Sequence, residues 1–77
     1  MEIHINLKLF ATLRRFLPRS AGHYPVPAGI TIRDLIATLG IPEKEAKLIF
    51  IDGVRATFDS TLKGDERVGI FPPVGGG

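Results

Sequence analysis

The sequence lacks cysteine and tryptophan and has only two histidines among its 77 residues. Without cysteine the chain can form no disulfide, no thiolate metal site and no persulfide of its own. His4 and His23 lie nineteen positions apart, and no carboxylate is placed beside them to complete a metal shell. The sequence therefore predicts no metal site, and nothing in it indicates a secreted fold held together by disulfides.

Long apolar runs are also missing. The longest stretches, such as Leu48–Ile51, are far shorter than the ~20 residues that a membrane span needs. The N-terminus alternates polar and apolar residues, which is unlike a signal peptide. We therefore expect a soluble, cytoplasmic protein with no membrane partner.

Catalytic constellations are scarce too. Ser20 and Ser60 have no histidine placed by the local sequence and stand on no strand-to-helix elbow, so a catalytic triad is not expected. Asp65 and Glu66 are adjacent, which directs their side chains differently on a turn and strand. The length allows one domain, residues 1–77, with little stability to spare for a catalytic cavity. We predict that the chain is not an enzyme by itself.

Charge is nearly balanced, but one basic cluster stands out. The net charge is +2, and no acid occurs between Glu2 and Asp34, a stretch that holds Arg14, Arg15 and Arg19. Three arginines fall short of the continuous basic stripe that nucleic acid requires, so no nucleic-acid partner is expected. Arg14 and Arg15 are predicted to meet an acidic protein surface; a solvated helix end is the alternative.

Hydrophobic periodicity predicts the secondary structure. Residues 2–10 alternate as a strand, and residues 11–17 have the spacing of a short helix that stops before Pro18. Residues 24–27, in which Tyr24 and Val26 alternate with two prolines, form a poor edge strand. Ile32, Leu35, Ile36 and Leu39 mark the main helix, which begins after Thr31 and ends at Gly40.

The second half of the chain adds three strands. Leu48–Ile51 and residues 54–58 flank Asp52-Gly53, a dipeptide typical of two-residue hairpins, and Val68 and Ile70 alternate into a last strand. Five strands, one main helix and one short helix favour an α+β fold, with a mixed sheet packed on one face by the main helix.

The C-terminal end carries the remaining chemistry. Residues 72–77 are predicted to form a flexible tail in which Pro72 and Pro73 favour an extended backbone. Val74, Gly75 and Gly76 then lead to Gly77, and the glycines leave the terminal carboxylate free of side chains. A carboxylate is a poor acyl donor until it is activated, so this tail suits activation by a nucleotide-binding enzyme. Gly77 is the predicted reactive residue.

Two phenylalanines near this end are out of phase with the core. Phe10 falls in register with the polar positions of the first strand, and Phe71 alternates out of step with Val68 and Ile70. We predict that Phe10 and Phe71 form an exposed aromatic patch that docks a partner, with an inward turn of either ring as the alternative.

At these residues the sequence resembles a known family. Phe71-Pro72-Pro73-Val74, ending in Gly76-Gly77, is similar to the terminus of the molybdopterin synthase small subunit family. Leu9-Phe10-Ala11-Thr12-Leu13-Arg14 resembles the end of that family's first strand, and Leu62-Lys63-Gly64-Asp65 resembles its turn into the last strand. The resemblance covers nearly the whole chain and implies a β-grasp, ubiquitin-like fold.

The resemblance also implies a function. Members of this family are sulfur carriers: an E1-like adenylyltransferase uses ATP to adenylate the terminal glycine, and a sulfur donor enzyme supplies the sulfur of a thiocarboxylate. The sulfur is delivered to a cofactor precursor with a synthase large subunit as partner, and the carrier binds no cofactor itself. Three alternatives stay open, namely a thiamine-pathway sulfur carrier, a ubiquitin-like modifier conjugated through Gly77, and an RNA-binding β-grasp module.

Overall fold

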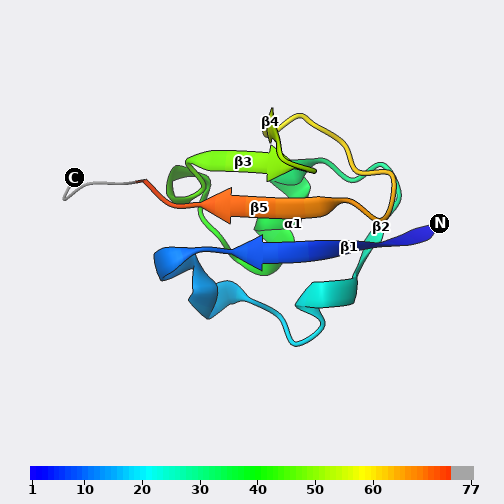
Figure 1. The fold of residues 1–77 in the computed structure, drawn as a ribbon, viewed down its shortest axis with the longest axis horizontal. Helices are drawn as coiled ribbons and strands as arrows, with labels where there is room; N and C mark the ends of the chain where they lie inside the picture. Colours follow the sequence, from blue (N-terminus) through cyan, green and yellow to red (C-terminus); the bar gives the residue numbers. More distant parts are fainter. Residues whose placement is uncertain (74–77) are drawn as a thin grey trace.

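Five strands form one mixed sheet in the computed structural model, which describes residues 1–73. The strands are β1 (Glu2–Leu9), β2 (Tyr24–Pro27), β3 (Leu48–Ile51), β4 (Val54–Ala56) and β5 (Arg67–Phe71). Their order is β2-β1-β5-β3-β4, with β1 and β5 parallel and the other pairs antiparallel (Figure 1). The predicted α+β, β-grasp arrangement is confirmed.

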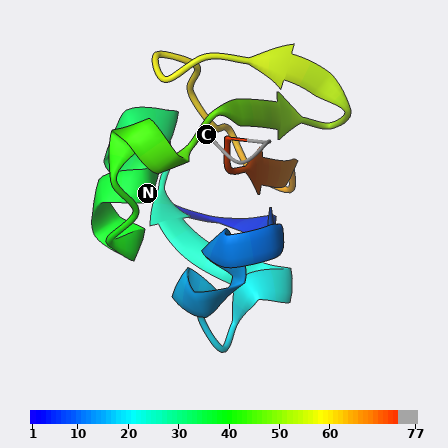
Figure 2. The same ribbon diagram turned by 90° about the vertical axis from the view of Figure 1, so that its left-hand side faces the viewer.

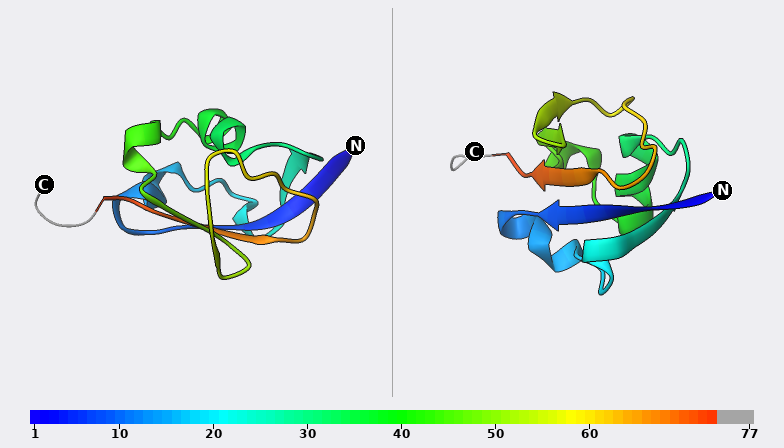
Figure 3. Two further views of the ribbon diagram at one scale, coloured as in Figure 1. Left: turned by 90° about the horizontal axis from the view of Figure 1, so that it is seen from above. Right: turned by 45° about the vertical axis from the view of Figure 1, so that its right-hand side comes forward.

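The core lies between the sheet and the helix α1 (Ile32–Leu39). Alternate residues of β1 and β5 face α1, as the period of a half-buried strand requires. These residues and the apolar stripe of α1 are buried together: Ile5, Leu7, Leu9, Val68 and Ile70 against Ile32, Leu35 and Ile36. Figures 2 and 3 show α1 on one side of the sheet. We call the opposite side the open face.

Both ends of α1 are capped as the sequence predicts. The Thr31 hydroxyl accepts a hydrogen bond from the Asp34 N–H at 3.1 Å, which satisfies one of the free donors of the first turn. Gly40 has φ 82°, and the Ile41 N–H donates to the Ile36 carbonyl at 2.9 Å. Glycine adopts this left-handed conformation without a Cβ clash, so the helix ends here.

Three shorter helical segments are of the 3-10 type: η1 (Ala11–Phe16), η2 (Ala21–His23) and η3 (Glu43–Glu45). The short helix expected over residues 11–17 is therefore η1. Its apolar residues Leu13 and Phe16 are three apart, and in a 3-10 helix such residues lie on the same side. Both pack toward the core. No helix within residues 1–73 combines the length and apolar character that crossing a membrane requires.

The hairpin after β3 is shorter than predicted. Asp52 and Gly53 have φ 53° and 82°, the left-handed pair that a type I′ turn needs. However, β4 ends at Ala56 and not at Phe58. The Thr57 N–H donates to the Ser60 hydroxyl at 3.1 Å, and the Ser60 N–H donates to the Thr57 carbonyl. This local turn draws residue 57 out of the strand.

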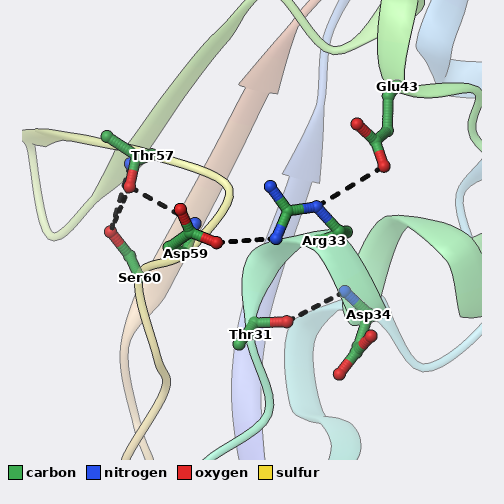
Figure 4. A network of polar contacts seen from close by, with 7 residues as sticks. All are labelled: Thr31, Arg33, Asp34, Glu43, Thr57, Asp59 and Ser60. Atoms are coloured by element: carbon green, nitrogen blue, oxygen red, sulfur yellow. Dashed lines mark hydrogen bonds and ion pairs between the residues drawn. The ribbon is translucent and has the colours of Figure 1, made fainter.

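An exposed polar network joins α1 to the turn after β4 (Figure 4). The Arg33 guanidinium donates to the Asp59 carboxylate at 2.6 Å, and its Nε lies 3.6 Å from a Glu43 carboxylate oxygen. The hydrogen bond to Asp59 is the main cause that raises the pKa of Arg33 above its ordinary value. Exposed ion pairs add little stability, so the network contributes little to the free energy of unfolding.

The outer edge of β2 is closed by proline. The Ala28 N–H donates to the Met1 carbonyl at 2.7 Å, and Pro25 and Pro27 stand opposite His4 and Glu2. Hydrogen-bonded pairs alternate along an antiparallel ladder, so both prolines occupy positions whose N–H would point away from the sheet. Proline has no N–H, and this edge therefore offers no donor from either position.

The cap of α1 gives a test of the local energetics. Thr31→Ala should lower the free energy of unfolding by about 1 kcal/mol, because the Asp34 N–H loses its acceptor. Thr38→Ala is the matched control, since the Thr38 hydroxyl only donates back to the Asp34 carbonyl and alanine is the better helix former. Urea unfolding of both variants measures the difference; equal loss of stability in the two would contradict the capping role.

Candidate functional site

The chain leaves the sheet at the end of β5, beside η1. The Lys47 N–H donates to the Phe71 carbonyl at 2.9 Å and so fastens the last residue of β5 beside the start of β3. Pro72 is buried and Pro73 is exposed. The predicted tail residues Val74, Gly75 and Gly76 and the predicted reactive residue Gly77 lie outside the described residues, and their roles stay predictions.

Phe10 and Phe71 meet on the open face. Leu9 pairs with Ile70 in the parallel ladder, and the Phe10 N–H donates to the Ile70 carbonyl at 3.2 Å, so the next residues of both strands are neighbours. The two rings stack with centroids 4.1 Å apart and an interplanar angle of 0°. Both are half-buried, whereas the sequence suggested an exposed pair. The rings cover each other, which accounts for the difference.

The backbone bends sharply just after this stack. Ala11 has φ 52°, in the left-handed region that costs a residue with a Cβ roughly 1 kcal/mol. The bend turns the chain from β1 into η1 while Phe10 keeps its place beside Phe71, and the Leu13 N–H donates to the Phe10 carbonyl at 3.0 Å. The strained residue therefore adjoins the aromatic pair.

Arg14 and Arg15 lie in the last turn of η1 and are exposed. The Arg15 guanidinium carbon lies 4.9 Å from the centroid of the Phe16 ring, a cation–π distance. Neither arginine forms an ion pair with the part of the chain that is described. Arg14 and Arg15 stand four and five positions after Phe10 in the chain, and they are free to meet an acidic surface.

The open face also carries residues that the sequence did not single out. Phe50 packs edge-on against Phe71, with centroids 5.8 Å apart and an angle of 85°. A hollow of about 260 Å³ adjoins these rings, and its lining includes Lys8, Arg67 and Gly69. Phe50 stands in a strand whose four residues are all apolar, so alternation could not tell which face it occupies. Only the pairing of β3 with β5 does so.

The two histidines are closer than their sequence separation suggested. The His4 and His23 rings stack at 3.9 Å with an interplanar angle of 2°. A Glu2 carboxylate oxygen lies 3.8 Å from His4 Nε2, so the expectation of no neighbouring carboxylate was wrong. Parallel stacked rings do not direct their nitrogens to a common point, and residues 1–73 hold no group of three or more side chains placed to bind a metal ion.

Comparison with protein families gives a match over nearly the full chain. The family model described as Mut7-C ubiquitin matches residues 2–75. A comparison with curated proteins finds no match.

Solved structures with a similar fold include proteins from Haloferax volcanii and Pyrococcus furiosus. The Haloferax volcanii HVO 2177 protein has a TM-score of 0.76 at 20% identity, over 99% of this chain and 88% of that one. A candidate molybdopterin converting factor, subunit 1, from Pyrococcus furiosus has a TM-score of 0.64 at 27% identity, over 94% and 99%. The small archaeal modifier protein 1 of H. volcanii has a TM-score of 0.67 at 20% identity, over 94% and 99%.

The stacked pair predicts a measurable coupling. In a double-mutant cycle of Phe10→Ala and Phe71→Ala, the interaction energy should be about 0.5 to 1.5 kcal/mol, the range found for aromatic pairs beyond their area of burial. Phe58→Ala combined with Phe71→Ala is the control, because Phe58 packs near Arg33 and not in the stack. Additive losses of stability for Phe10 and Phe71 would show that the two rings do not support each other.

Proposed function

The chain belongs to the Mut7-C ubiquitin family, and on this premise we propose that it is a carrier protein whose Gly77 carboxylate is activated and converted to a thiocarboxylate. The observation that carries the proposal is the position of β5. This strand lies between β1 and β3 in the sheet, so it holds the start of the tail firmly. Beyond Phe71 the sequence is Pro-Pro-Val-Gly-Gly-Gly, and its last three residues have no side chains.

The proposed chemistry takes place on a partner. A carboxylate oxygen of Gly77 attacks the α-phosphorus of ATP, pyrophosphate leaves, and an acyl adenylate forms. Hydrosulfide released by a sulfur donor enzyme then attacks the acyl carbon: a C–S bond forms, the bond to AMP breaks, AMP leaves, and the thiocarboxylic acid loses its proton to water. The E1-like adenylyltransferase supplies the magnesium and phosphate contacts, and the carrier supplies a tail thin enough for a narrow channel.

The open face would present the tail to its partners. Phe10 and Phe71 provide apolar area at the place where the chain leaves the sheet, and aromatic residues are frequent hot spots of interfaces. Arg14 and Arg15 would steer an acidic surface toward this area. We propose that the partners are an E1-like adenylyltransferase and the large subunit of a synthase, with sulfur delivered to a molybdopterin precursor; a thiamine-pathway acceptor is the alternative.

A second candidate function uses the same activated carboxylate. The structure described as small archaeal modifier protein 1 has this fold. The second candidate function is therefore conjugation of Gly77 to lysines of other proteins. The two functions differ in the product. Intact mass after incubation with ATP, an E1-like enzyme and a sulfur donor would increase by the difference between sulfur and oxygen for a carrier, whereas a modifier would form isopeptide-linked conjugates.

The reactive end can be tested directly. Deleting Gly77, or adding one residue after it, should abolish adenylate formation and leave the melting curve unchanged, because the tail follows the packed sheet. ATP–pyrophosphate exchange with an E1-like enzyme measures the reaction. The control carries one extra residue at the N-terminus, before Met1, and should leave exchange intact. Normal exchange by the C-terminally extended protein, without trimming, would refute the proposal.

Steering by the η1 arginines has its own signature. Arg14→Glu should slow association with the activating enzyme at low salt and have less effect at high salt, because rim charges mainly change association rates. Arg33→Glu is the control for charge reversal at another site, because the Arg33 side chain contacts Asp59 and Glu43 on the side of the sheet that α1 covers. Its association rate shows how much of the effect comes from net charge alone. An association rate for Arg14→Glu equal to that of the unmodified protein at low salt would leave Arg14 as an ordinary solvated cation.

A further inference from the structure

The hollow on the open face exists because one strand position has no side chain. Gly69 is the third residue of β5, which lies between β1 and β3. Its cross-strand neighbours on the open face are Lys8 and Phe50, and Arg67 and Phe71 stand two residues before and after it. Side chains therefore surround Gly69 while none fills the centre, and the hollow measures about 260 Å³.

The fold does not require glycine at this position. A Cβ placed on Gly69 would approach Phe10 Cε2 at 3.5 Å, an ordinary van der Waals contact, and the backbone there is not in the left-handed region. Glycine inside a strand weakens it and often marks a place where another molecule approaches closely. Packing within residues 1–73 therefore has room for a Cβ at this position and does not explain its absence.

The walls and the rim of the hollow differ in chemistry. Phe10, Phe50 and Phe71 form an aromatic wall, whereas Lys8 and Arg67 are cations on the rim. Neither cation forms an ion pair within residues 1–73. The carboxylate of Asp52, in the adjoining hairpin, accepts a hydrogen bond from the backbone N–H of Arg67 at 2.9 Å. The rim therefore presents positive charge that is still available to a partner.

We propose that the hollow over Gly69 receives one large apolar side chain of a partner protein, from a segment that also carries carboxylates for Lys8 and Arg67. Charge complementarity selects an acidic segment, and the aromatic wall selects an apolar residue within it. Gly69 is then a specificity-determining residue, because the open space above it decides which side chain fits. Single large side chains seated in such pockets are typical anchors of protein interfaces.

Two other occupants fit the geometry less well. Small-molecule sites usually measure about 300 to 1,000 Å³ and enclose their ligand, and this hollow is smaller. Single-stranded nucleic acid stacks its bases on free aromatic faces. Here Phe10 and Phe71 stack on each other and Phe50 packs edge-on against Phe71, so these rings turn much of their surface to one another.

The inference rests on the proposed function for the need to bind a partner, but its test measures binding alone. Four probes are titrated into the full ¹⁵N-labelled chain: a ten-residue peptide with a central leucine among aspartates and glutamates, the same peptide with alanine for leucine, the same peptide with lysines for the acids, and a ten-nucleotide oligouridylate. Amide shifts report where each probe binds.

The acidic leucine peptide should shift the amides of Lys8, Gly69 and Phe71, and the shifts should weaken in 0.5 M salt. The alanine peptide should bind about tenfold more weakly, because the burial of one leucine is lost. Gly69→Ala should also weaken binding about tenfold while the melting temperature stays equal or rises, since alanine suits a strand better than glycine does. Lys8→Glu should weaken binding further.

Gly22→Ala and Arg19→Glu are the matched controls. Gly22 is exposed in η2 with nothing near its Cβ position, and Arg19 is an exposed cation outside the hollow; both variants should bind like the unmodified chain. Equal binding of the lysine peptide, unchanged affinity of Gly69→Ala, or stronger shifts of the same amides by oligouridylate would overturn the proposal. None of these outcomes would affect pyrophosphate exchange at Gly77, so the two proposals fail separately.

Discussion

The parallel pairing of β1 with β5 is the constraint on which the rest of the structure depends. It sets residues 6–9 beside residues 67–70 in the middle of the sheet. Because β5 also pairs with β3, this one strand joins the two hairpin-like halves of the molecule. The register aligns Leu7 with Val68 and Leu9 with Ile70 on the side of α1, and it leaves Lys8 beside Gly69 on the other side. A slip by one residue would exchange these two faces.

The two faces of the central strands therefore have separate tasks. The buried positions supply the contacts with α1 that hold the domain together. The intervening positions carry three aromatic rings, two rim cations and a glycine. These residues form the surface of the open face and add less to the stability of the fold than the buried positions do. Ala11, with its left-handed backbone, keeps Phe10 at the end of that surface while the chain turns away into η1.

Much of this arrangement could be predicted from local signals. Alternation in residues 3–9, the Thr31 cap, Gly40 and the Asp52-Gly53 turn each act within a few residues, and the structure has each of them where expected. The phase of Phe10 and Phe71 placed both on one face, although their mutual burial depends on contact between strands that are distant in sequence. The role of Gly77, which stays a prediction, came from the glycine-rich tail, whereas the sulfur-carrier pathway came from the resemblance at Phe71-Pro72-Pro73-Val74.

The remainder could not be predicted because it depends on pairing across the sheet. Phe50 lies in an all-apolar strand, so no local pattern assigns its face, and Gly69 looks like any strand glycine until its neighbours Lys8 and Phe50 are known. His4 and His23 meet only because η2 packs against β1. The end of β4 at Ala56 follows from the hydrogen bonds between Thr57 and Ser60, which compete with a strand that the apolar residues alone would have extended to Phe58.

The central position of β5 has a consequence for how the molecule acquires its structure. A parallel pair formed by the first and last strands joins residues more than 60 positions apart in the chain, and such non-local contacts make folding slow, because the loop must close before the contacts stabilise it. The surface around Phe71 is built from β1, β3 and β5 together, so it exists only in molecules in which these strands have paired. A partner that recognises the open face therefore recognises completed molecules.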